Sequence, residues 1–181
     1  AANTDGVHMS ITPYITATEQ TSGVRDLMRA DSTHRFRPGF GGIAVVQGGP
    51  IIVAGRAYND RRLKDDPTFL GKKNRTFVGR MEEAYLSAQF TYGEAFLGRL
   101  GRTWGPPPRE GLMVGNAAYS YDHLYIKLGV PAFRMSTIIT RLDDVIGPPG
   151  VGSDTARRYV SMHQLAARFG NFEIGVNEAA I

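Results

Sequence analysis

The chain has 181 residues, enough for one domain with a sizeable core, and its net charge is +4 at pH 7. It contains no cysteine, which excludes disulfides, thiol nucleophiles and cysteine-based metal sites. It contains no apolar run long enough for a membrane-spanning helix, and its Lys and Arg residues are scattered. The scattered charge predicts no nucleic-acid partner.

The first predicted elements are a lone strand and a hairpin. Residues 8–17 alternate strictly between apolar and polar side chains, as a strand with two different faces does. Pro13 within this strand favours an edge position, because proline cannot donate to a sheet ladder. Residues 34–59 predict a hairpin, with Gly48 and Gly49 as its two-residue turn.

The central hairpin is predicted over residues 77–104, after a charged loop at residues 61–73. In its first strand, polar and apolar residues alternate from Glu83 to Phe90. Its turn is predicted within residues 91–94, and its second strand alternates less cleanly. This second strand leads to Trp104 and then to a stop at Gly105 and three prolines.

Two further hairpins are predicted over residues 122–142 and 157–181, separated by a loop rich in Gly, Pro and Asp. They turn at residues 129–131 and at Gly170 and Asn171. No stretch has the pattern of a long amphipathic helix. The sequence therefore predicts an all-β antiparallel meander of hairpins. The chain starts at Ala1 in polar sequence and ends at Ile181 within a strand-like run. We therefore expect residues 1–181 to be a single domain that is an internal fragment of a longer β-barrel protein.

Two architectures fit this alternation: a soluble β-sandwich and a transmembrane β-barrel. The apolar faces are thin and rich in Ala, Gly, Thr and Met, whereas the polar faces carry long side chains that suit a wide lumen. For a barrel, the side chains predicted to face lipid are Ala84, Leu86, Phe96, Leu124, Ile126, Phe133, Met135 and Ile174. Those predicted to face the lumen are Glu83, Tyr85, Arg99, Tyr125, Arg134, His163 and Glu173.

The segments EEAYLSAQF, GEAFLGRLGRTWGPP and RRYVSMHQLAARFGNFEIGVNEAAI resemble the Wzi-like capsule-assembly family of bacterial outer-membrane proteins. The resemblance covers residues 75–181. One difference is Gln164, which stands where the family commonly has a basic residue. The positions that match the family's last two strands are Arg158, Tyr159, His163, Glu173 and Glu178.

The resemblance implies a large transmembrane β-barrel in the bacterial outer membrane that assists capsular or exopolysaccharide assembly or surface attachment. It implies no catalysis. The expected partners are an acidic polysaccharide and the lipid bilayer. Two alternatives stay open: a porin-like channel on the same fold, and a soluble β-sandwich that acts on carbohydrate.

The candidate polysaccharide-binding residues are arginines and aromatics, because Arg clamps carboxylates and aromatic rings stack on sugars. They are Tyr85, Arg99, Trp104 and Arg134. Trp104 also suits a membrane-interface anchor or loop packing. Three residues are assigned structural roles in the lumen. His163 is expected to bond to Glu or Tyr neighbours, Glu83 to pair with Arg99, and Glu173 to line the same face.

The sequence predicts no enzyme, cofactor or metal site. Glu82 and Glu83 are adjacent in a strand and should point to opposite faces, so they cannot act as a pair of catalytic carboxylates. The four histidines lack the spacing of a metal site.

Overall fold

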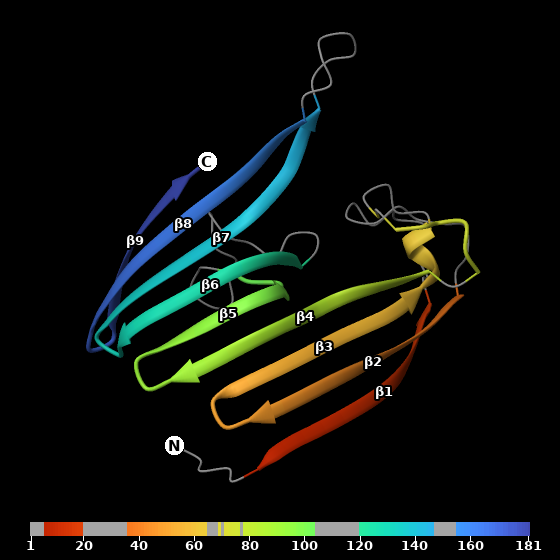
Figure 1. The fold of residues 1–181 in the computed structure, drawn as a ribbon, viewed down its shortest axis with the longest axis horizontal. Coiled ribbons are helices and arrows are strands. Elements are labelled where there is room, and N and C mark those ends of the chain that lie inside the picture. The colour runs from red at the N-terminus through yellow and green to blue at the C-terminus, as the bar shows by residue number, and fades with distance from the viewer. Residues whose placement is uncertain are drawn as a thin grey trace. The chain divides into compact units, whose positions relative to one another are not determined.

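The structure is a computed structural model that describes residues 6–19, 36–64, 69, 71–76, 78–103, 120–146 and 155–181. Its described strands form one antiparallel sheet in sequence order (Figure 1), which confirms the predicted all-β meander. Among the residues described, no helix is long and apolar enough to span a membrane. The elements are β1 (Val7–Glu19), β2 (Phe36–Gly48), β3 (Ile51–Asp60), η1 (Arg61–Lys64), β4 (Gly79–Phe90), β5 (Gly93–Leu100), β6 (Tyr121–Val130), β7 (Phe133–Ile146), β8 (Thr155–Phe169) and β9 (Phe172–Ala180).

All four predicted hairpins are confirmed, as β2–β3, β4–β5, β6–β7 and β8–β9. Strand β1 stands at one end of the strand order, as Pro13 indicated. The first turn was misplaced by one residue: β2 includes Gly48, so Gly49 and Pro50 form the turn. Gly49 and Gly170 have φ of 55° and 59°, the left-handed backbone that a two-residue turn needs and that glycine adopts without strain.

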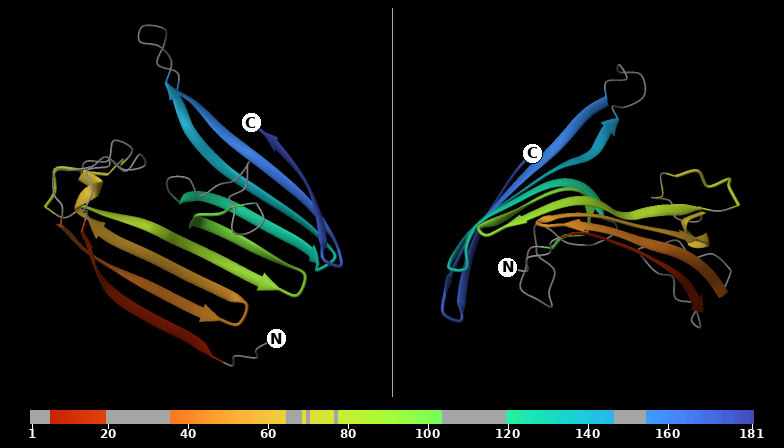
Figure 2. Two further views of the ribbon diagram at one scale, coloured as in Figure 1. Left: turned by 180° about the vertical axis from the view of Figure 1, so that it is seen from behind. Right: turned by 60° about the horizontal axis from the view of Figure 1, so that its bottom comes forward.

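The strands divide into two compact units. The second unit contains the end of β4 and all of β5 to β9. Its register places Leu128, Met135, Leu165 and Val176 in one row across β6, β7, β8 and β9. Figure 2 shows these four strands side by side. We call the side of the second unit that carries this row the apolar face.

The opposite side of the second unit, which we call the mixed face, carries its buried core. Phe96 lies opposite Tyr125, which lies opposite Ile138, which lies opposite Met162. All four side chains are buried. Since Tyr85 packs on Phe96 with ring centroids 5.1 Å apart, the end of β4 contributes to the same core.

The first unit contains β1, β2, most of β3 and the start of β4. Met9 and Ile15 of β1 pair with Val46 and Phe40 of β2, and all four side chains are exposed. On the other side, the Tyr14 ring covers Gly41. A Cβ atom at that position would lie 2.5 Å from the ring, so only glycine leaves room for it.

The register corrects three of the predicted orientations. Phe96 is 2% exposed on the mixed face and not on the face predicted to meet lipid. Arg99 and His163 lie on the apolar face, opposite to Arg134, and not with it. The error in β5 has a physical cause: Phe96 and Leu97 are adjacent and both apolar, so the sequence alternation favours neither register, and a slip of one residue exchanges the faces.

Candidate functional site

The apolar face of the second unit exposes many hydrophobic side chains, and a cross-strand row of Thr137, His163 and Glu178 interrupts them. Leu97 is 61% exposed, Ile126 is 37% exposed and Val176 is 66% exposed. Met135, Ile139, Leu165 and Ile174 are also exposed there. Soluble monomers rarely expose apolar patches of this extent, so the face indicates an interaction surface.

Aromatic side chains line one end of the apolar face. Phe133, Phe169 and Phe172 flank the β6–β7 and β8–β9 turns on this face and are exposed. Phe90, beside the β4–β5 turn, is also exposed, and it lies on the same side of β4 as Leu86 because the two are an even number of positions apart. Each two-residue turn of the second unit therefore has a phenylalanine next to it. Such an aromatic row at the edge of an apolar band is the pattern of a membrane–water interface.

Charged groups mark the other end of the apolar face. The guanidinium of Arg99 donates to both carboxylate oxygens of Asp122, from Nε at 3.0 Å and from Nη2 at 2.5 Å. The predicted pairing of Glu83 with Arg99 is therefore wrong. Asp122 lies directly opposite Arg99 on β6, so the fork geometry of arginine is satisfied locally.

A double-mutant cycle measures this ion pair. We expect Arg99→Gln and Asp122→Asn to show a coupling of about 0.5–1 kcal/mol in the free energy of unfolding, because the pair is bidentate but exposed. The control cycle combines Arg99→Gln with Glu173→Gln and should show little coupling, because Glu173 pairs with Arg134 and not with Arg99. An equal coupling in both cycles would contradict the assignment.

His163 sits among polar neighbours within the apolar face. Its Nδ1 lies 3.1 Å from the Thr137 hydroxyl, and its Nε2 lies 2.8 Å from the Ser161 hydroxyl. The expected Glu or Tyr hydrogen-bond partner is thus replaced by two hydroxyls, although Glu178 is its cross-strand neighbour on β9. Both ring nitrogens are satisfied, which favours a structural role for this histidine.

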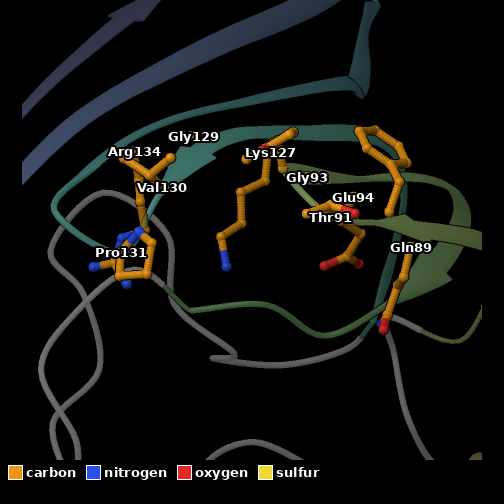
Figure 3. A pocket seen from close by; sticks show the side chains of 11 residues that line it. Gln89, Thr91, Gly93, Glu94, Lys127, Gly129, Val130, Pro131 and Arg134 are labelled. Carbon is orange, nitrogen blue, oxygen red and sulfur yellow. The ribbon is translucent and has the colours of Figure 1, made fainter. Parts of the chain in front are cut away.

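A cavity of about 460 Å³ lies at the turn end of the mixed face (Figure 3). The side chains of Lys127 and Glu94 extend into its open space. Arg134, one of the predicted polysaccharide-binding residues, lines it from β7. The lining comes from the β4–β5 and β6–β7 hairpins: Gln89, Phe90, Thr91, Tyr92, Gly93, Glu94, Lys127, Gly129, Val130, Pro131 and Arg134.

Of the two cationic side chains at this cavity, Arg134 has an acidic partner and Lys127 has none among the described residues. Nη2 of Arg134 donates to Oε1 of Glu173 at 2.6 Å, which confirms that these two residues share a face. The side chain of Lys127 has neither a hydrogen bond nor an ion pair with any residue that the structure describes. Lys127 was not among the predicted site residues. The cross-strand register could have identified Lys127, because this residue lies directly opposite Glu94.

The structure does not bring the predicted polysaccharide-binding residues together. Tyr85 packs in a row of rings with Phe96 and His123, whose centroids are 4.8 Å apart. Arg99 is on the apolar face, and Arg134 lines the cavity. Trp104 lies outside the described residues.

Glu83 takes part in a charge cluster of the first unit. Nε of Arg56 lies 3.6 Å from Glu82, and its Nη1 lies 3.7 Å from Glu83. One guanidinium therefore lies within ion-pair distance of both carboxylates. The prediction that Glu82 and Glu83 do not act as a catalytic pair stays a prediction. Met81 and Leu86 are both exposed although they are five positions apart in the strand, so exposure does not follow a strict period of two here.

The described residues contain no group of three or more His, Cys, Asp or Glu side chains that could hold a metal ion. Comparisons with family models, with curated proteins and with solved structures find no match for this chain.

Proposed function

We propose that this chain forms part of the wall of a bacterial outer-membrane β-barrel that assists capsular or exopolysaccharide assembly or attachment. The observation that carries the proposal is the apolar face of the second unit. It combines exposed aliphatic side chains, a row of phenylalanines at one edge and a charged pair at the other. Lipid is the occupant that fits this arrangement best, because a mainly apolar zone between interfacial residues resembles the cross-section of a bilayer.

Strand length supports the same assignment. A transmembrane strand needs about 9–11 residues. Strands β6 and β7 have 10 and 14 residues, and β8 and β9 have 15 and 9. Alternation within them places most of the exposed aliphatic residues on one side, together with the polar row of Thr137, His163 and Glu178. It places Lys127, Arg134 and Glu173 on the other side. A membrane barrel needs both surfaces, one for lipid and one for its lumen.

The polysaccharide role rests on the resemblance to the Wzi-like family and on the chemistry of the mixed face. Charged and amide side chains line the cavity between two hairpins there. Such groups suit sugar hydroxyls and the carboxylates of an acidic polymer. We propose a non-enzymatic role, with weak contacts multiplied along a repeating polymer.

Deletion of the gene in a capsulated host tests this function. We expect polymer to appear in the medium while total polymer stays constant, because retention is lost and synthesis is not. The measurement is uronic acid in the cell-bound and released fractions. A fall in total polymer with normal cell-bound retention would contradict the proposal.

A porin-like channel is the second candidate, favoured by the charged side chains on the mixed face. Reconstitution into planar bilayers separates the two functions. A polysaccharide-assembly protein should show no steady conductance, whereas a channel should conduct ions through an open lumen. A soluble carbohydrate-active protein would remain in the aqueous phase on detergent partitioning.

A further inference from the structure

We propose that the turn-end cavity is a binding site for a carboxylate-bearing sugar unit and that it opens on the periplasmic side of the outer membrane. The proposal rests on the proposed function and goes further by naming the binding site for the acidic sugar and the side of the membrane from which the sugar approaches. It assigns a role to Lys127, which is one of the cavity's two cationic side chains together with Arg134.

The side of the membrane follows from the lengths of the connections. In transmembrane barrels the periplasmic turns are short and the extracellular loops are longer. The strands of the second unit join through two-residue turns at residues 91–92, 131–132 and 170–171. At their other ends the strands are separated by residues 101–120 and 147–154. The short turns therefore indicate the periplasmic end.

The cavity belongs to that same end. It is lined by Thr91, Tyr92 and Pro131, which are turn residues, and by the strand residues next to them. The backbone N–H of Gly129 donates to the Tyr92 carbonyl at 2.8 Å, which holds the two hairpins together at the cavity. The site is thus a structured part of the sheet end.

The chemistry of the lining selects the ligand class. The Lys127 ammonium extends into the cavity and has no anionic partner within the described part of the chain, so it is available to a carboxylate. Arg134 uses one guanidinium nitrogen for Glu173, and a guanidinium has five N–H donors. Its remaining donors can bind the same anion.

The neutral and acidic groups suit the rest of a sugar. Gln89 and Thr91 offer amide and hydroxyl groups, and Glu94 accepts hydrogen bonds from sugar hydroxyls. Tyr92 offers an exposed ring on which a sugar can stack. The cavity volume of about 460 Å³ lies in the range of about 300–1,000 Å³ that is typical for small-molecule sites.

Binding is tested with digalacturonate as the acidic probe and maltose as the neutral one, on purified protein in detergent. We expect Lys127→Gln to weaken digalacturonate binding about tenfold, because one charge-assisted contact is lost, and to leave maltose unaffected. Glu94→Gln should not weaken digalacturonate binding. The matched control is Lys72→Gln, which makes the same charge change at an exposed position far along the chain. Equal binding by the Lys127 and Lys72 variants would overturn the site.

The side of approach is tested by labelling single cysteines with a membrane-impermeant maleimide, since residues 1–181 contain no cysteine of their own that would react. We introduce Asn171→Cys in the β8–β9 turn and Thr103→Cys after the opposite end of β5, both at exposed positions. Asn171→Cys should react only after the outer membrane is opened, whereas Thr103→Cys should react in intact cells.

Reaction of Asn171→Cys in intact cells would overturn the periplasmic assignment while leaving the barrel itself in place. Recovery of both variants in the soluble fraction would instead contradict the proposed function, and with it the assignment of a side.

Discussion

Replacing Ile126 by arginine is expected to destabilise the chain in a bilayer by about 2–4 kcal/mol. Ile126 is the central apolar-face residue of β6, with Leu124 and Leu128 on either side of it along the strand. If this face meets lipid as proposed, Ile126 lies between the phenylalanine row at the turn end and the Arg99–Asp122 pair at the other end, where a guanidinium would lose its hydration. The measurement is a urea titration of folding into phospholipid vesicles.

One control variant and the size of the Ile126→Arg effect separate lipid from water as the surroundings of this face. Phe172→Arg at the turn end should cost about 0–1 kcal/mol, because the cost of arginine falls toward the interface. If the face met water, Ile126→Arg would change stability by no more than about 0.5 kcal/mol. Equal, small effects at both positions would contradict a lipid-facing surface.

Replacing Phe96 by alanine is expected to cost about 3–5 kcal/mol in the free energy of unfolding. Phe96 is almost fully buried, and its ring packs between Tyr85 at 5.1 Å and His123 at 4.8 Å between centroids. Removal of the ring leaves a cavity in the mixed face and ends both contacts. The same titration in vesicles measures the loss.

Phe90→Ala is the matched control for this prediction, because it removes the same ring from an exposed position beside a turn. Its cost should be well below that of Phe96→Ala. A cost at Phe90 equal to or greater than that at Phe96 would mean that the buried and exposed faces of the hairpin had been exchanged.

Much of the fold could be predicted because its elements depend on local chemistry. Alternation of period two identifies strands without reference to partners, and turn residues such as Gly170 limit where a chain can reverse. Every predicted hairpin is therefore present. The boundaries differ by a few residues: β7, for example, continues to Ile146, beyond the predicted end at residue 142.

The faces could be predicted only where the alternation is clean. Ile174 and Glu173 in β9 were correctly assigned to opposite faces of the sheet, because apolar and polar residues alternate without interruption at this point of the strand. In β5 the adjacent Phe96 and Leu97 allow either register, and packing of Tyr85 and His123 against Phe96 decides between them. That choice also determines the side of Arg99.

The sequence by itself determined the class of fold, the hairpins and the absence of cysteine chemistry, because each of these depends on residue type or on neighbours along the chain. Only the tertiary structure decided which charges meet. Arg99 pairs with Asp122, Arg56 reaches both Glu82 and Glu83, and Lys127 faces a cavity between two hairpins. The physical reason is that cross-strand register sets these contacts, and a shift of one residue would replace every partner.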